Sequence, residues 1–591
     1  MMRGFLPVSK EGLKERGWNE LDIILVTGDA YVDHPSYGAA IIGRVLEDAG
    51  FKVGIIAQPD YRKTDDFQRL GKPKLFFGVT AGNLDSMVAN YTANIKVRNI
   101  DDYSPAGKPH LRPDRASIIY TNKLQQVFKD VPIVLGGMEA SMRRLAHYDY
   151  WSDKVRRSLL LDAKADILVY GMGEKQVLEI AKRLRNGEKI SELDNIRGTV
   201  TSRKKVDSLE NFILIPSYEE AISGKDKFNK AFKTTYMESD PIRGKAVAQK
   251  HGDRFVIQYP PAIPLTTEEI DKIYSLDFMR EWHPSYNREG GVPGFKTVRN
   301  STISHRGCAG GCSFCSLYLH QGGIVQSRSI ESMVNEIKLL SEDKKFKGTV
   351  TDIGGPTANL YMAECPSWKS AGVCTDKKCL MPQKCKNLKL GYAYSIRLWR
   401  ELKKIPRVKH VFVGSGVRYD LLTDSYADEY LNELCAYHVS GQLKVAPEHC
   451  VDSILELMNK PKFTVYEKFI DKFENINRRL NKKQFLVNYF IVGHPGAALK
   501  DALQLAVYLA KKRIHPEQVQ DFIPLPMTVS GAMYYTESDP FTGKSVYVAK
   551  SPRERMMQRA LLQYKNPQNR KYIQKALKIL DKEGLKRLLL P

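Results

Sequence analysis

Residues 305–316 read His-Arg-Gly-Cys-Ala-Gly-Gly-Cys-Ser-Phe-Cys-Ser and follow a predicted strand, Thr302 to Arg306. Cys308, Cys312 and Cys315 have the spacing C-x3-C-x2-C on this short loop. Glycines let a backbone fold tightly, so three thiolates can converge there on one inorganic centre. A structural zinc site uses four protein ligands, whereas a [4Fe-4S] cluster held by three leaves one iron open. The loop therefore favours an iron-sulfur centre.

Two other interpretations of this loop stay open. His305 could supply a fourth ligand and complete a Cys3His zinc site. The three cysteines could also be inert and buried. A disulfide is disfavoured by the expected reducing compartment.

The composition describes a folded protein of several cores, with 591 residues, 42% of them hydrophobic and 27% charged. The first residues, MMRGFLPVSKEGLKERGW, lack the continuous apolar run of a signal sequence, and no later run approaches the length that spans a bilayer. We therefore expect a cytoplasmic protein with no membrane partner. In such a compartment its nine cysteines are expected to be metal ligands or core residues.

The N-terminal part, residues 1–195, alternates short apolar runs with helical patterns, which is typical of βαβ units. We predict a Rossmann-like domain of five parallel strands with helices between them. The strands are Asp22 to Gly28, Lys52 to Ala57, Leu75 to Thr80, Pro132 to Gly137 and Asp166 to Gly171. Such sheets bind ligands at the carboxyl ends of their strands. Two roles are open for the polar strand ends at 29–38, 136–139 and 171–174. They could contact a ligand, or they could form the turns that any βαβ unit needs.

Three further regions complete the predicted organisation. Residues 196–295 are less periodic and are interpreted as a connecting segment with a hairpin at Ala246 to Gln258. Residues 296–540 contain six predicted strands alternating with helices, which predicts a (β/α)6 partial TIM barrel. The strands lie near Thr302 to Arg306, Gly348 to Gly354, His410 to Gly414, Gln442 to Ala446, Phe485 to Val492 and Gln518 to Ile523. The barrel carries a cysteine-rich insertion at 361–390. Residues 541–591 form a basic tail of helices broken near Pro567, expected to pack against the barrel.

Polar residues follow several of the predicted barrel strands, where barrels carry their chemistry. Gly354 and Gly355 end the second strand, Ser415 and Arg418 follow the third, and Glu448 follows the fourth. His449 and His494 also lie at strand ends. Each reads as a ligand contact or as a turn residue.

The cysteine loop resembles that of the radical SAM superfamily, CxxxCxxC with an aromatic residue, here Phe314, before the third cysteine. The resemblance implies that Cys308, Cys312 and Cys315 bind a [4Fe-4S] cluster. It implies that S-adenosylmethionine occupies the fourth iron and is cleaved reductively to a 5′-deoxyadenosyl radical, with electrons from a flavodoxin or ferredoxin. The turn Gly354-Gly355 looks like the one that meets the amino group of S-adenosylmethionine. We therefore expect Gly354, Gly355, Ser415, Arg418 and Glu448 to contact the cofactor.

Nearly the whole chain resembles the YgiQ-type family of radical SAM proteins. DAYVDHPSYG (29–38), GGMEASMRR (136–144), DIGGPTANLY (352–361) and VAPEHC (445–450) carry the resemblance together with the cysteine loop. It implies no substrate. The N-terminal domain looks like the cobalamin-binding type that precedes many radical SAM barrels. The base-off motif DxHxxG is absent, because Asp33 and His34 are adjacent, and this argues against cobalamin itself.

A second set of cysteines lies in the insertion. Cys365, Cys374, Cys379 and Cys385 have the spacing C-x8-C-x4-C-x5-C. Four thiols in a segment of little apolar content could staple it around a metal, either zinc or an iron-sulfur cluster. Reduced surface thiols are the alternative. Cys435 and Cys450 stand alone and are expected to be core or inert.

The formal net charge of +24 suits a polyanionic partner such as RNA. A solvated helical face in the basic tail explains part of the excess equally well. The main alternative function is therefore a zinc-stabilised nucleic-acid-binding protein without radical chemistry. It would be colourless and would bind RNA with a steep salt dependence.

Overall fold

The computed structural model describes residues 4–206 and 210–590. The chain divides into two compact units. The first contains residues 1–299 and the short segment Leu319–Gly322, and the second contains 300–318 and 323–591. Among the described residues, no helix is both long enough and apolar enough to cross a membrane.

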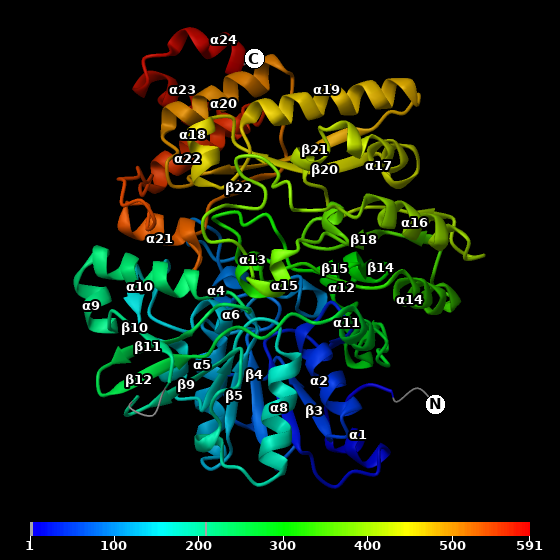
Figure 1. The fold of residues 1–591 in the computed structure, drawn as a ribbon, viewed down its shortest axis with the longest axis vertical. Helices are drawn as coiled ribbons and strands as arrows, with labels where there is room; N and C mark the ends of the chain where they lie inside the picture. The colour runs from blue at the N-terminus through cyan, green and yellow to red at the C-terminus, as the bar shows by residue number, and fades with distance from the viewer. Residues whose placement is uncertain (1–3, 207–209, 591) are drawn as a thin grey trace. The chain divides into compact units, whose positions relative to one another are not determined.

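A nine-stranded sheet forms the centre of the first unit (Figure 1). Five parallel strands lie in the order β3-β1-β4-β5-β8, and β9, β12, β11 and β10 extend the sheet beyond β8. The bounds are β1 (Ile23–Thr27), β3 (Val53–Ala57), β4 (Phe76–Thr80), β5 (Ile133–Gly136), β8 (Ile167–Val169), β9 (Thr199–Arg203), β10 (Phe212–Ile215), β11 (Ala246–His251) and β12 (Arg254–Gln258).

Helices cover both faces of the parallel part. Helix α2 (Gly38–Asp48) packs its Gly43 against Leu25 and Ile55 on one face. On the other face, α5 (Ala116–Val127) and α7 (Leu159–Ala163) bury a core with Ile24 and Val26 of β1. Fully apolar strands are what a sheet buried on both faces requires. The remaining helices are α1 (Lys10–Glu15), α3 (Asp65–Gln68), α4 (Ser86–Asn90), α6 (Gly137–Met142), α8 (Glu174–Arg185), α9 (Tyr218–Ser223), α10 (Lys225–Met237), α11 (Thr267–Tyr274) and α12 (Pro293–Val298).

The sheet is larger than the sequence predicts. All five expected parallel strands are present, and the hairpin at 246–258 is confirmed as β11 and β12. The difference lies in residues 196–295, which we interpreted as a connecting segment. They supply four strands to the same sheet, because β9 pairs antiparallel with β8 and lets the hairpin and β10 continue the ladder. The expectation of a five-stranded sheet is therefore wrong.

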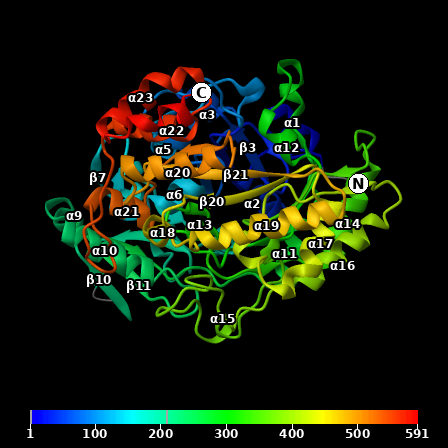
Figure 2. The ribbon, with the colours of Figure 1, turned by 90° about the horizontal axis from the view of Figure 1, so that it is seen from above.

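The second unit is also α/β and has seven short parallel strands among its described residues. Two of them, β20 and β21, lie side by side in Figure 2. The seven strands pair as β14 with β18, β17 with β19, and β20 with β21 and β22. The strands are β14 (Ser301–Ile303), β17 (Thr349–Val350), β18 (Asp352–Gly354), β19 (His410–Val411), β20 (Gln442–Glu448), β21 (Phe485–Val492) and β22 (Val519–Asp521). The helices between them are α14 (Ile330–Glu342), α15 (Ser367–Ser370), α16 (Tyr392–Lys403), α17 (Asp428–Glu433), α18 (Asp452–Leu457), α19 (Phe463–Arg479), α20 (Leu499–Lys511) and α21 (Val529–Thr536).

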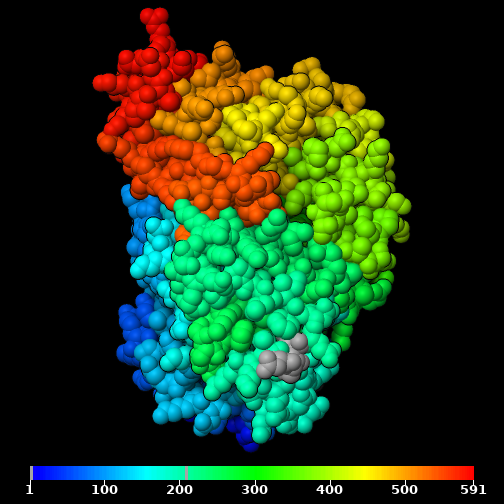
Figure 3. All heavy atoms as spheres, turned by 60° about the vertical axis from the view of Figure 1, so that its left-hand side comes forward, coloured from blue at the N-terminus to red at the C-terminus, as the bar shows by residue number. Residues whose placement is uncertain are grey.

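The basic tail packs as part of this unit. Helices α22 (Pro552–Leu562), α23 (Arg570–Ile579) and α24 (Lys586–Leu589) share one apolar core with α20 and with β21 and β22. In Figure 3 the red C-terminal residues lie directly on the orange segment before them. The predicted break at Pro567 is confirmed as a short 3-10 turn between α22 and α23. The tail therefore uses mainly its leucines for packing and leaves most of its lysines and arginines outside, with Arg555 as a buried exception.

Candidate cofactor site

The cysteine loop begins after β15 (His305–Arg306), which pairs with β16 (Gln326–Ser327), and leads into α13 (Ser316–Gln321). Gly307 has a φ of +79°, and a Cβ there would lie 2.0 Å from the carbonyl oxygen of Ile324. Gly311 also has a positive φ, +58°. Both positions need glycine, since other residues rarely adopt this conformation. The backbone therefore turns tightly enough to bring the three cysteines onto one short loop.

Residues far along the chain hold this loop in place. The Asn459 side-chain amide donates to the carbonyl oxygens of Gly310 and Gly311 at 3.1 and 2.7 Å. The Ser313 N–H donates to the carbonyl oxygen of Met458, and the Ser313 carbonyl accepts from the Ser530 N–H at 2.9 Å. The loop backbone is thus fixed independently of its sulfur atoms, which leaves the thiols available as ligands.

The thiols lie in low-dielectric surroundings. Burial raises the pKa of Cys308, with a further contribution from the neighbouring Cys312 thiol, and burial raises the pKa of Cys315 to about 12. The neutral thiols of Cys308 and Cys315 are therefore favoured when no metal is bound, whereas a coordinated metal deprotonates its thiol ligands. The Gly310 N–H donates to the Cys308 sulfur at 3.4 Å. This donor and the soft, three-sulfur ligand set fit an iron-sulfur cluster.

Arg418, which the sequence predicts as a contact of the cofactor, lies beside the cysteine loop, and this contact with the loop was not predicted. Its Nη1 donates to the Cys312 sulfur at 3.6 Å, while Nη2 pairs with Asp420 at 2.7 Å. Asn359 fixes its backbone on both sides, at 2.9 Å each. The buried guanidinium therefore presents a positive charge to the Cys312 sulfur.

The predicted Gly-Gly turn lies at the end of β18. The Gly354 carbonyl oxygen accepts from the N–H and hydroxyl of Ser304, at 2.7 and 2.8 Å. A Cβ on Gly354 would lie 3.3 Å from the Ser415 hydroxyl, so the structure brings these two predicted residues together. Asp352 fixes the facing strand end, because its Oδ1 accepts from the N–H groups of Gly414 and Ser415.

His305 packs under this turn. A Cβ on Gly355 would lie 2.3 Å from the His305 ring, and Ser304 lies 2.9 Å from the ring's Nδ1. Burial lowers the pKa of His305 to about 3, so the ring is neutral. This packing explains why residue 355 is a glycine. It also gives His305 a structural role beneath the turn, which disfavours a Cys3His zinc site.

The remaining predicted strand-end residues lie at β20 and β21. Glu448 is buried, has a φ of +67°, and lies 3.7 Å from the Lys460 Nζ. His449 is buried, and its Nδ1 accepts from the Val451 N–H. His494 is buried at 0% exposure, and its Nε2 lies 2.6 Å from the Ser530 hydroxyl.

The packing of Phe314 explains why an aromatic residue stands before Cys315. Its ring lies edge-on to His494, with centroids 6.1 Å apart. His494 in turn contacts Phe522, 5.1 Å away. The aromatic residue therefore packs the loop against the end of β21. The only sequence signal for this contact is the position of His494 after a predicted strand.

The strand-end clusters of the first unit are internally paired. Asp33 is buried and bound to Arg44, and the His34 Nδ1 accepts from the Ser36 N–H. Asp29 pairs with Arg112 at 2.8 Å. In 136–139, Glu139 is buried and accepts from the Ser86 and Ser117 N–H groups, which holds the N-termini of α4 and α5. These side chains stabilise the edge of the sheet.

In the second cysteine set, Cys365, Cys374, Cys379 and Cys385 line one pocket in the insertion. Cys435 is buried, and Cys450 packs at the edge of the core shared by α20 and the tail, in agreement with the expectation for both.

Comparison with known proteins places this site in a family. The profile described as "Radical SAM N-terminal" matches residues 5–301, "Radical SAM superfamily" matches 302–509, and "Domain of unknown function (DUF3362)" matches 517–588. The UPF0313 protein of Methanocella arvoryzae is 51% identical over 578 residues, which cover 98% of this chain and 96% of that relative. The UPF0313 protein of Clostridium botulinum (strain ATCC 19397 / Type A) is 50% identical over 581 residues, 98% of this chain and 90% of that relative.

Two solved structures are similar at lower identity. The radical S-adenosylmethionine methyltransferase TsrM from Kitasatospora setae, with cobalamin and a [4Fe-4S] cluster bound, is 15% identical with a TM-score of 0.49, covering 86% of this chain and 74% of that one. The cobalamin-dependent S-adenosylmethionine radical enzyme OxsB is 11% identical with a TM-score of 0.47, covering 97% and 62%. The family profiles and the relatives of about half identity over nearly the full length confirm the YgiQ-type resemblance, and the chain belongs to the UPF0313 family of radical SAM proteins.

Proposed function

We propose that Cys308, Cys312 and Cys315 hold the [4Fe-4S] cluster of this radical SAM enzyme. Membership of the superfamily implies the cluster, S-adenosylmethionine and a reductant. The observation that carries the residue assignment is the cysteine loop itself. Its backbone is fixed by Asn459, and Arg418 donates to one of its sulfurs. Three protein ligands leave the fourth iron open for S-adenosylmethionine.

We propose that S-adenosylmethionine lies along Gly354, Gly355 and Ser415. These residues belong to neighbouring strand ends in the same unit as the loop, and Asp352 joins the two ends. Glu448 lies at the end of a further strand. When bound, the cluster supplies the electron that cleaves S-adenosylmethionine and yields a 5′-deoxyadenosyl radical. The protein's own residues bind the cofactor, orient it and exclude water.

Arg418 and His494 have positioning roles in this proposal. Arg418 places a fixed positive charge against the Cys312 sulfur, which counters the negative charge of a thiolate-bound cluster. His494, neutral because burial lowers its pKa to about 3, holds Phe314 and the Ser530 hydroxyl. Neither residue has to exchange a proton for these roles.

The finer architecture proposed for the second unit is a (β/α)6 partial barrel. Neighbouring strands pair in chain order with parallel register, and backbone bonds continue between the paired sets. The Ile353 N–H donates to the Phe412 carbonyl at 3.1 Å and the Val417 N–H to the Lys444 carbonyl at 3.1 Å. These links support one continuous series of six parallel segments. Domain limits of 1–195, 196–295, 296–540 and 541–591 stay a prediction.

We infer that His34 does not ligate cobalamin in the manner of a base-off motif. Its neighbour Asp33 is committed to Arg44, and the ring is buried against Phe295 with centroids 5.7 Å apart. Flavodoxin or ferredoxin as the reductant follows from the superfamily. An RNA partner has only the net charge in its favour, and the apolar packing of the tail explains that region without one.

The cluster assignment is tested with Cys312→Ala, purified and reconstituted without oxygen. We expect a loss of about four iron atoms per chain relative to the parent protein, and no 5′-deoxyadenosine after dithionite reduction with S-adenosylmethionine. Cys450→Ala is the matched control, since this cysteine lies outside both sets. Continued reductive cleavage by Cys312→Ala would show that the three-cysteine assignment is wrong.

A further inference from the structure

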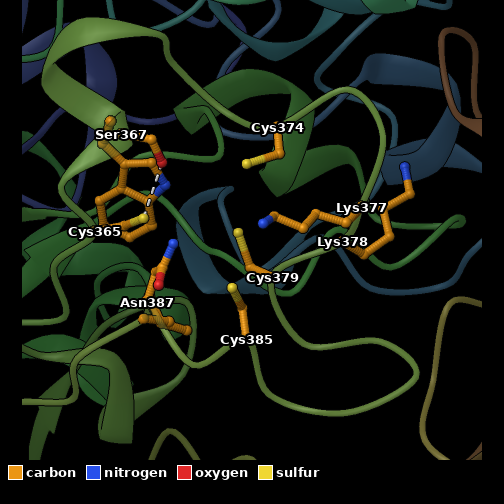
Figure 4. A pocket seen from close by; sticks show the side chains of 10 residues that line it. Cys365, Ser367, Cys374, Lys377, Lys378, Cys379, Cys385 and Asn387 are labelled. Atoms are coloured by element: carbon orange, nitrogen blue, oxygen red, sulfur yellow. Dashed lines mark hydrogen bonds between the residues drawn. The ribbon is translucent and has the colours of Figure 1, made fainter.

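The cysteine-rich insertion builds a pocket of its own. Cys365, Cys374, Cys379 and Cys385 line it together with Trp368 and Leu388, and the pocket is partly open to solvent. Figure 4 shows the side chains of the four cysteines on different sides of this pocket. The sulfurs surround it instead of meeting at one point. In the part of the chain that the structure describes, no three Cys, His, Asp or Glu side chains form a close single-ion group.

The four thiols share one electrostatic environment. Burial raises the pKa of Cys379 to about 11, and the three other thiols of the set each contribute to this rise. A backbone contact joins two of these cysteines, because the Cys385 N–H donates to the Cys379 carbonyl at 2.8 Å. The Trp368 N–H donates to the Cys365 carbonyl at 3.1 Å and closes a local turn. All four cysteines line one pocket although Cys365 and Cys385 lie 20 positions apart in the sequence.

Basic side chains border the pocket. Lys377 and Lys378 line it, and the Lys384 Nζ donates to the carbonyl oxygens of Cys385 and Leu388, at 3.3 and 3.0 Å. Four thiolates on a metal centre carry excess negative charge, and nearby lysines offset it. The insertion is thus suited to an anionic metal-thiolate group.

The insertion has little other structure to hold it. Within residues 361–391 the described elements are the four-residue helix α15 and one isolated bridge between Glu364 and Lys389. Few of its residues are fully buried, Trp368, Leu380 and Leu388 among them. A segment of this kind gains its order from a metal, because metal binding supplies folding free energy.

We propose that Cys365, Cys374, Cys379 and Cys385 hold a second [4Fe-4S] cluster, separate from the one at the cysteine loop. A zinc ion draws its four sulfurs to about 2.3 Å, whereas in the described part of the chain no three of these side chains form such a close single-ion group. Zinc sites also use short ligand pairs of the C-x2–4-C type, of which this set contains one, Cys374 and Cys379. A cluster with four thiolates has no open iron. It would therefore not bind S-adenosylmethionine.

The test begins with the full-length triple variant Cys308→Ala, Cys312→Ala and Cys315→Ala, purified and reconstituted without oxygen. Its iron, sulfide and zinc contents are measured, together with its EPR spectrum after dithionite reduction. We expect about four irons and four sulfides per chain and a spectrum that S-adenosylmethionine does not change. Adding Cys379→Ser should remove this iron, whereas adding Cys450→Ser should not.

Zinc in place of iron, or no metal at all, in the folded triple variant would overturn the proposal. If the triple variant does not fold by circular dichroism, Cys379→Ser in the otherwise intact chain gives the same answer. Its iron should fall from about eight to about four per chain and S-adenosylmethionine should still perturb the remaining signal. An unchanged iron content would overturn the proposal. The result does not depend on the first cluster, so either assignment can fail alone.

Discussion

Gly355 has no positive φ, so the need for glycine there comes from space. A Cβ would lie 2.3 Å from the His305 ring, and His305 is fully buried with Ser304 against its Nδ1. The ring cannot move far without losing this packing. Packing against the His305 ring therefore constrains the turn that we propose to contact S-adenosylmethionine.

Gly355→Ala should lower stability by about 1–3 kcal/mol, the usual cost of overpacking, and weaken the binding of S-adenosylmethionine. Thermal unfolding and calorimetric titration measure the two effects. Gly584→Ala is the control, because nothing lies within 4 Å of a Cβ at that position. Adding His305→Ser should restore part of the stability, and a double variant no better than Gly355→Ala would contradict the steric explanation.

Arg418→Gln should shift the reduction potential of the cluster that we propose for the cysteine loop to more negative values. The positive charge of Arg418 and its hydrogen bond to the Cys312 sulfur both stabilise the reduced, more negative cluster. The variant loses both, so reduction becomes less favourable. A shift on the order of 50 mV corresponds to somewhat more than 1 kcal/mol for one electron. An EPR-monitored redox titration measures it. Arg418→Lys keeps the charge, so its reduction potential should shift less. Equal shifts in the two variants would show that the charge of Arg418 is not the cause.

The sequence predicts the ligands of this site better than their surroundings. Three cysteines on one loop can be recognised from their spacing, because all three lie within residues 308–315. Arg418 and Asn459 contact the loop across 106 and about 149 residues, so no local pattern links them to it. The position of Arg418 after a predicted strand was a signal, whereas Asn459 follows a helix and no sequence pattern indicated it.

At the scale of elements, the strength of the apolar pattern decides what can be predicted. The strand predicted at Phe485 to Val492 has the bounds of β21, and the other barrel strands are found within a few residues. Strands β9 and β10 were missed. β9 reads Thr-Val-Thr-Ser-Arg with little apolar content, and β10 lies at the sheet edge with Leu214 61% exposed. Such strands form because a neighbouring strand supplies backbone hydrogen-bond partners, and a local sequence pattern does not show which strand will be the neighbour.

Helix α23 allows a matched test of the tail. Ile573 is fully buried in the core shared with α20, and Ile579 on the same helix is 56% exposed. Ile573→Ala should destabilise the protein by about 2–5 kcal/mol, since it leaves a cavity. Ile579→Ala should change stability by less than about 0.5 kcal/mol. Urea unfolding measures both. Equal effects would mean that the tail does not pack as the structure shows, and would revive a role for it in binding.

At the scale of the whole molecule, burial keeps many histidines neutral. The pKa values of His147, His251, His438 and His449 are lowered to about 4, and those of His305 and His494 to about 3. In an unfolded chain a histidine titrates near 6.5. Between these values the unfolded state binds more protons, so stability rises with pH and is lost as pH falls below about 6.5.

Stability should therefore fall between pH 7 and pH 5. One buried histidine contributes up to about 2 kcal/mol to this loss, since the slope approaches 1.4 kcal/mol per pH unit. His438 serves as the test residue, because its Nδ1 bonds to the Val411 carbonyl away from both cysteine sets. His438→Gln should flatten the pH dependence measured by thermal unfolding. A variant that loses as much stability on acidification as the parent would contradict this account.

The short segment Leu319–Gly322 belongs to the first unit although it follows the cysteine loop in the chain. In that unit the His320 ring lies 3.0 Å from the Ser141 hydroxyl. A ribosome delivers residues from the N-terminus at about 5–20 per second, so the N-terminal unit cannot complete its packing until residue 322 has emerged. By then all three cysteines of the loop have been synthesised. We therefore expect cluster delivery during biosynthesis to meet a chain whose first unit is finishing its own folding at the same moment.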